Sequence, residues 1–167
     1  KNDWDSKEIS WDYVRHPIVP ASDSDETSLM SSFELLTQAW KRSVSRLKEI
    51  EEIINTIFID AYGFRNSLSI SIPIEQISLH CNPKYRYGHG KKEGEYEVLL
   101  RTDTIKELIS YSIGCMMGRY SLDEPGLIYA HSGNKDFDSS RYTTFSADED
   151  GIIRSEEHTS ELQSRQV

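Results

Sequence analysis

Hydrophobic residues recur every three or four positions over a long stretch near the middle of this chain, which is typical of an amphipathic helix. Ser31 or Ser32 can cap the start of such a helix, and Gly63 can cap its end. Lysine, arginine and glutamate fill the opposite face. We therefore predict a long helix over residues 32–61. Its apolar stripe consists of Leu36, Trp40, Val44, Leu47, Ile50, Ile53, Ile54, Ile57, Phe58 and Ala61.

A second stretch repeats the same spacing. Thr104 stands three residues before Glu107, and this pair has the pattern of a capping box, in which each side chain satisfies a free backbone N–H at a helix start. Gly118 is suited to end the helix. We predict a helix over residues 104–118, with an apolar face made of Ile105, Leu108, Ile109, Ile113, Met116 and Met117.

Between the two predicted helices the pattern changes to alternation. Ile70, Ile72 and Ile74 alternate with serine and proline, and residues 77–79 continue in the same way. Alternation of this kind predicts a few short strands, with Pro73 holding them at a sheet edge. The predicted fold class is therefore α+β, mainly α.

Composition indicates that the chain belongs to something larger. Only 37% of its 167 residues are hydrophobic, and the mean hydropathy is -0.59. This is lean for a self-sufficient core, so we expect a fragment of a larger multidomain protein. The formal net charge of -9 opposes general adhesion to DNA, because lysine and arginine supply most nonspecific affinity for phosphate. Any DNA contact must be local.

Residues 81–92 form a basic and aromatic cluster in this acidic chain. Gly88 and Gly90 let the backbone turn, cationic side chains can bind phosphate or read guanine, and tyrosines can stack on a displaced base. An ordinary solvated loop with its tyrosines packed beneath it explains the pattern equally well. The DNA-contact candidates are Lys84, Tyr85, Arg86, Tyr87, His89, Lys91 and Lys92.

Other chemistry is sparse. His80, Cys81 and His89 lack the paired spacing of a zinc site, so we expect no metal, and Cys81 and Cys115 are expected to be reduced thiols. No apolar run approaches the roughly 20 residues that span a bilayer, and the N-terminus has no signal-peptide pattern. We therefore expect no membrane partner and a cytoplasmic location.

Two residue strings carry a resemblance to a known family. The segments 81–88 and 102–134 resemble the C-terminal half of the BREX-type (PglX) adenine-specific DNA methyltransferases, which are phage-defence proteins, and residues 93–100 and 134–153 are similar to the same family. The resemblance implies a parent enzyme that uses S-adenosylmethionine and acts on DNA. It also implies contact with an upstream methyltransferase domain and, in principle, with other phage-defence proteins.

The motifs that such an enzyme needs for catalysis are missing from this chain. Adenine methyltransferases of this kind hold the cofactor at a glycine-containing strand-to-helix turn and the adenine at an Asn/Asp-Pro-Pro-Tyr/Phe loop. Asn82-Pro83-Lys84-Tyr85 echoes that loop, but Lys84 replaces the second proline. We expect no catalytic and no cofactor-binding residues here, and assign the chain to a spacer or to target recognition.

Three parts follow along the chain. Residues 1–31 are expected to form an extended arm and linker, whose Trp11 and Tyr13 either pack on the catalytic domain or stack on a nucleotide. Residues 32–153 are the helical spacer or target-recognition segment. Residues 154–167 resemble the translation of a sequencing-library adapter, so we set them aside as a non-native tail.

The charged face of the long helix also allows two interpretations. Lys41, Arg42 and Arg46 would touch backbone phosphate if the helix were a lever between domains, or they are solvated surface charges. A different class of function is also open. The long helix and the Met116–Met117 face would dock a partner protein if the chain were an acidic helical protein-interaction module.

Overall fold

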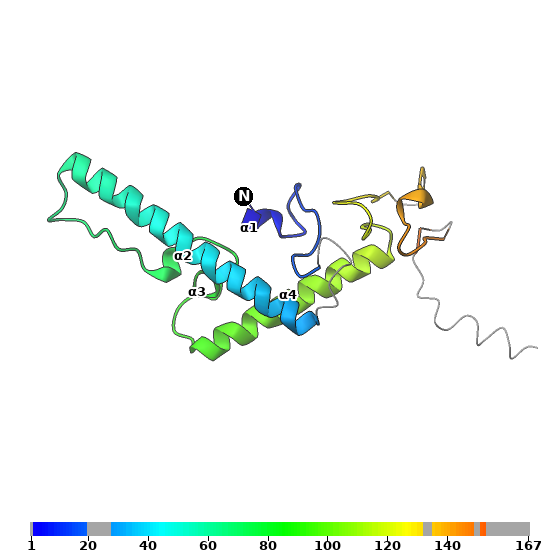
Figure 1. The fold of residues 1–167 in the computed structure, drawn as a ribbon, viewed down its shortest axis with the longest axis horizontal. Coiled ribbons are helices and arrows are strands. Elements are labelled where there is room, and N and C mark those ends of the chain that lie inside the picture. Colours follow the sequence, from blue (N-terminus) through cyan, green and yellow to red (C-terminus); the bar gives the residue numbers. More distant parts are fainter. Residues whose placement is uncertain (1, 20–27, 132–134, 149–150, 153–167) are drawn as a thin grey trace, which may run out of the picture.

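The computed structural model describes residues 2–19, 28–131, 135–148 and 151–152. These residues form helices and loops and contain no strand. Two long helices, α2 (Leu29–Tyr62) and α4 (Glu93–Met116), dominate the molecule (Figure 1). The shorter elements are α1 (Asn2–Asp5), α3 (Pro83–Tyr87) and two 3-10 turns, Ile74–Gln76 and Ser139–Arg141.

Helix α2 confirms the predicted long helix and begins slightly earlier than expected. Ser28 is its N-cap, and the Ser28 hydroxyl accepts a hydrogen bond from the Ser31 N–H at 3.2 Å. Gly63 ends the helix with a φ of 75°, a left-handed conformation that glycine adopts without strain. Gly63 is thus confirmed as the predicted end of the helix, whereas Ser31 and Ser32, the predicted N-caps, lie within the helix.

The prediction for the second helix was right in type and wrong in its start. Helix α4 begins at Glu93, because the Glu95 carboxylate accepts a hydrogen bond from the Lys92 N–H at 2.7 Å. Thr104 lies inside the helix, where its hydroxyl donates to the Leu100 carbonyl at 2.7 Å. A threonine in a helix interior can make this bond to the preceding turn, so the Thr104–Glu107 pair imitates a cap.

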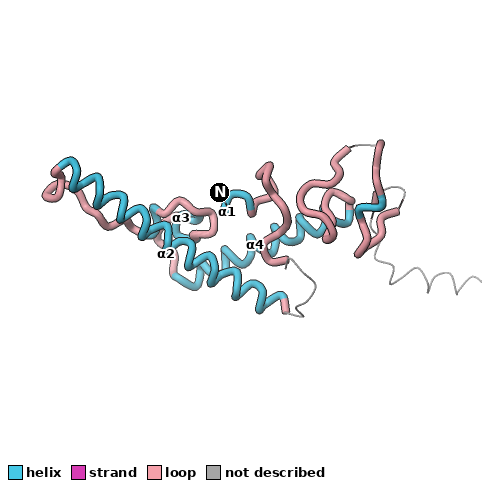
Figure 2. Tube along the Cα trace, turned by 45° about the horizontal axis from the view of Figure 1, so that its top comes forward, coloured by secondary structure: helices cyan, strands magenta, loops and turns pink. Residues whose placement is uncertain are grey.

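The predicted short strands around residues 70–79 are wrong. After Gly63 the chain turns back along α2, as both ribbon and tube show (Figures 1 and 2). Ile72, Ile74 and Ile77 pack in the cluster around Val44 of α2, and the Ile72 N–H donates to the Glu52 carboxylate at 3.1 Å. The apolar face of α2 and the Glu52 side chain thus provide the packing and the backbone hydrogen bond that a neighbouring strand would have provided.

Two separate clusters of buried residues hold the molecule together. One joins Val44 of α2 to Ile77 and Cys81 of the returning segment. The other joins three tyrosines, Tyr13, Tyr111 and Tyr120. The expected arm, residues 2–19, thus contributes Tyr13 to the second cluster. Residues 20–27 of the expected linker and the whole of 154–167 lie outside the described part of the chain.

Candidate nucleic-acid interface

The basic and aromatic segment is anchored by Asn82. Asn82 is 2% exposed, and its side-chain amide donates to the carbonyls of Ile74 at 2.7 Å and Ile77 at 2.9 Å. Its side-chain oxygen accepts from the Lys84 N–H at 3.2 Å, which makes Asn82 the N-cap of α3. Pro83 in the first turn suits a helix start. Part of the segment expected to be a loop is therefore a five-residue helix.

Helix α3 is tied to α4 by charged hydrogen bonds. The Arg86 guanidinium lies 3.0 Å from the Asp103 carboxylate and 3.2 Å from the Glu107 carboxylate. The Tyr87 hydroxyl donates to Asp103 at 2.8 Å. Burial, reinforced by the hydrogen bond to Asp103, raises the pKa of the Tyr87 phenol. Arg86 and Tyr87 are thus engaged within the chain.

The remaining candidates lie toward solvent. Lys84 is paired with Glu93 at 3.2 Å, and the Lys91 ammonium donates to the Tyr87 carbonyl at 2.5 Å. The candidates whose residues are exposed are Tyr85, His89, Lys91 and Lys92. The structure therefore divides the predicted site into an inner pair that binds α4, one lysine at the margin, and an exposed edge.

The N-terminal arm, residues 2–19, contacts the same region, where α3 lies against α4. The Asp3 carboxylate accepts hydrogen bonds from the N–H groups of His80 at 2.6 Å and Cys81 at 2.9 Å. The Lys7 ammonium lies 2.8 Å from the Glu107 carboxylate, which also receives Arg86. Glu107 thus joins the arm, α3 and α4. Sequence reasoning missed Asp3, Lys7 and the two α4 carboxylates, because their partners are remote in the chain and no local spacing marks them.

The two aromatic residues proposed for base stacking differ in their surroundings. Trp11 is fully exposed, whereas Tyr13 is 6% exposed. The Tyr13 ring meets Tyr120 edge-on at 5.6 Å between centroids and Tyr111 at 6.2 Å. Tyr13 is therefore a core residue, and of the two only Trp11 is presented to solvent.

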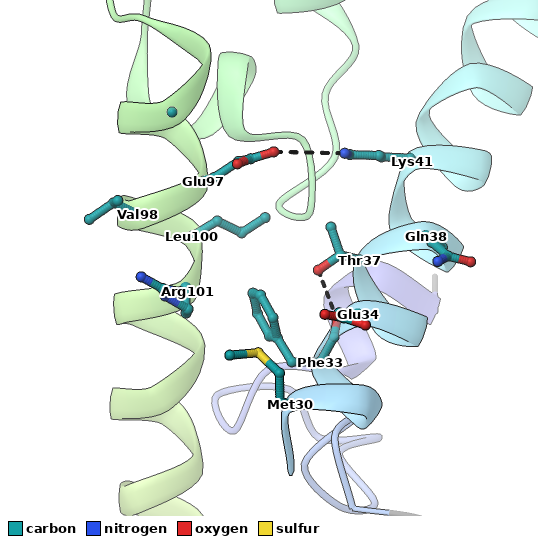
Figure 3. Close-up of a pocket in the computed structure, with 11 residues that line it drawn as sticks. Met30, Phe33, Glu34, Thr37, Gln38, Lys41, Glu97, Val98, Leu100 and Arg101 are labelled. Carbon is teal, nitrogen blue, oxygen red and sulfur yellow. Dashed lines mark hydrogen bonds and ion pairs between the residues drawn. The ribbon is translucent and has the colours of Figure 1, made fainter. Parts of the chain in front are cut away.

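A groove lies between the N-terminal parts of α2 and α4 (Figure 3). Its volume is about 460 Å³, and Met30 and Phe33 of α2 face Leu100 of α4 across it. Lys41 approaches Glu97 at 4.0 Å at one end. A second groove of about 320 Å³ continues from it to Asn82 and Lys84. The two grooves are thus lined by both apolar and charged side chains and lead to the basic segment.

The string that echoes the adenine-binding loop is engaged in contacts within the chain. The side-chain amide and oxygen of Asn82 are hydrogen-bonded to backbone groups of its own chain. The Asn82-Pro83-Lys84-Tyr85 string therefore does not offer these groups to an adenine amine or to S-adenosylmethionine. Within the described ranges, no three His, Cys, Asp or Glu side chains converge as metal ligands would. Among the same residues, no helix is both long and apolar enough to cross a membrane.

Comparison with known proteins identifies relatives of this segment. The chain is 38% identical over 157 residues to adenine-specific methyltransferase BrxX of Escherichia coli O9:H4 (strain HS) and 33% identical to adenine-specific methyltransferase PglX of Lacticaseibacillus casei (strain Zhang). Each match covers 92% of this chain but only 12% and 11% of the relatives. No protein-family profile matches the chain. The chain is therefore homologous to one segment of the BrxX and PglX methyltransferases.

Proposed function

We propose that this homologue of a BrxX/PglX segment is a helical spacer that presents a DNA-contacting edge within a BREX-type, adenine-specific DNA methyltransferase. Methyl transfer from S-adenosylmethionine would then take place in other parts of the longer protein, because Asn82, in the string that echoes the adenine-binding loop, is hydrogen-bonded to backbone groups of its own chain. The role of this segment would be to hold other parts in place and to contribute local contacts to DNA.

One observation carries this proposal. Glu107 of α4 forms ion pairs with both Lys7 of the arm and Arg86 of α3, so these two segments are held on one helix. The same arrangement leaves the short stretch from Tyr85 to Lys92 with an exposed edge of His89, Lys91 and Lys92. An exposed cationic edge on a segment that is tied to α4 suits phosphate contacts, which position a protein on DNA.

Fluorescence anisotropy with duplex DNA across a salt series tests the contact. The double variant Lys91→Ala/Lys92→Ala should bind more weakly, and the slope of log affinity against log salt should fall by roughly 2 if each lysine neutralises one phosphate. Lys41→Ala/Arg42→Ala is the matched control, since it removes two exposed cations from α2. An equal loss in the control would show that binding depends on overall positive charge and not on a contact at Lys91 and Lys92.

A flat titration of the unsubstituted chain at low salt would contradict direct DNA contact. The spacer role would then stand alone, supported by the tie through Glu107. The two parts of the proposal can therefore fail separately.

A further inference from the structure

We propose that the exposed apolar surface at the C-terminal end of α2 docks onto an apolar, uncharged surface of the same methyltransferase polypeptide outside this segment. This inference rests on the proposed function, which makes the chain part of a longer protein. We call this surface the distal face. It consists of Ile53, Ile54, Ile57, Phe58, Tyr62 and Phe64.

The distal face projects from the rest of the molecule. The C-terminal half of α2 extends beyond α3 and α4 together with the segment that turns back along it, and both views agree on this (Figures 1 and 2). That segment packs on another side of the helix, against Val44, and Ile59 of the helix is also buried. Ile53 and Ile57 remain 55% and 61% exposed. One side of α2 is thus packed while the isoleucine side is open.

Aromatic rings extend the open surface around the helix end. The rings of Phe58 and Tyr62 are stacked at 6.4 Å between centroids, and those of Tyr62 and Phe64 are stacked at the same distance. Tyr62 is 69% exposed. Isoleucines and a row of stacked rings together form a contiguous apolar surface, which is characteristic of an interaction site.

The cations beside the distal face are paired with carboxylates of the same chain. Arg46 is paired with Glu49 at 3.2 Å, Lys48 with Glu52, and Arg65 with Asp60 at 2.5 Å. Because these cations are engaged with carboxylates, they do not favour phosphate binding, and nucleic acid is a poor occupant for this surface. An uncharged apolar surface is the complementary one.

The lengths of the relatives indicate where that surface is. This segment corresponds to 12% of the E. coli relative and 11% of the L. casei relative, so most of each polypeptide lies outside it. A surface on the same chain is present at a high effective concentration, whereas a second copy must be recruited from solution. The covalent neighbour is therefore the favoured occupant.

Cysteine labelling in intact E. coli BrxX tests the proposal without DNA. Single cysteines are placed at the positions aligned with Ile54 and Ile57, and the same cysteines are placed in this chain alone as Ile54→Cys and Ile57→Cys. Maleimide labelling of each site is followed by peptide mass spectrometry. We expect labelling to be roughly tenfold slower or more in the intact protein, since a docked thiol is inaccessible.

Glu49 provides the control on the same helix. Its side chain is 61% exposed and belongs to the charged margin, so Glu49→Cys and its aligned counterpart should label at similar rates in both proteins. Hydroxyl-radical footprinting of the unsubstituted proteins gives the same comparison where a cysteine disturbs folding.

Two outcomes would overturn the proposal. The first is equal labelling of the Ile54 and Ile57 positions in the intact protein and in the isolated chain. The second is protection in the isolated chain that grows with concentration and accompanies a dimer in light scattering, which would make a second copy the occupant. Neither readout uses DNA, so the docking surface can fail while the DNA-contact proposal stands, and the reverse.

Discussion

His16 shows how strongly burial changes the meaning of a single residue. In the sequence it is a histidine before a proline in a polar arm, but in the structure it is 2% exposed. Its Nδ1 accepts a hydrogen bond from the Ile18 N–H at 3.3 Å. Burial lowers the pKa of His16 from 6.5 to about 4, while Glu107 raises it and Lys7 lowers it by smaller amounts. The folded chain therefore holds this imidazole neutral.

This pKa predicts a pH-dependent stability. Above pH 6.5 the imidazole is neutral in the folded and unfolded chains and contributes no difference. Between pH 6.5 and 4 only the unfolded chain takes up the proton, so the free energy of unfolding falls as the pH falls, by roughly 3 kcal/mol at most. Urea unfolding at pH 7.0, 5.5 and 4.5 should show this loss, and His16→Gln should reduce it.

His89→Gln is the control for the histidine experiment, because the His89 side chain is 78% exposed. That variant should follow the pH dependence of the unsubstituted chain. Carboxylates that titrate at the acidic end act on all three proteins alike, so the difference between the curves isolates His16. Parallel curves for His16→Gln and the unsubstituted chain would show that His16 titrates normally.

The ion pairs that join different helices differ in how much they contribute to stability. Arg86 is 19% exposed and lies between Asp103 and Glu107, whereas the Lys41–Glu97 pair is 70% and 66% exposed with its atoms 4.0 Å apart. Partial burial limits solvent screening, and exposed pairs contribute little. The α3–α4 tie should therefore matter for stability and the α2–α4 pair should not.

A double-mutant cycle measures that difference. Arg86→Ala combined with Glu107→Ala should give a coupling energy of about 1 kcal/mol or more in urea unfolding, and the matched cycle of Lys41→Ala with Glu97→Ala should give less than about 0.5 kcal/mol. Similar values for the two cycles would remove the structural role assigned to Arg86 and return it to the set of free DNA-contact candidates.

The elements also show what the sequence could and could not predict. Helix α2 was predictable because its apolar stripe and Gly63 act locally, although its N-cap is Ser28 and not Ser31 or Ser32. The start of α4 was missed because Thr104 bonds to Leu100 within the helix and imitates a cap. The prediction of strands around residues 70–79 failed because an alternating apolar pattern does not reveal whether a strand or a helix will pack against the segment. The basic segment was found, but its partners Asp103 and Glu107 are set by tertiary packing.

For the whole molecule, the two buried clusters are separate. The first surrounds Val44 and Ile77, and the second is made of Tyr13, Tyr111 and Tyr120. They are linked through α4 and the arm by the Asp3 hydrogen bonds to His80 and Cys81 and by the Glu107 ion pairs. Small cores joined by a few polar contacts favour separate local unfolding over one cooperative transition.

Hydrogen exchange can show whether the clusters unfold independently. Val44→Ala should leave a small cavity and accelerate exchange in residues 40–82. Gly114→Val should accelerate exchange in residues 105–122, since a Cβ at Gly114 would lie 2.6 Å from the Tyr120 ring, which is stacked on Tyr111 and has little room to move. Each variant is the control for the other, because each region should keep the exchange rates of the unsubstituted chain when the other cluster is altered. Acceleration across both regions by either variant would instead make the chain one cooperative unit, in which the ties through Asp3 and Glu107 couple the clusters as strongly as a shared core.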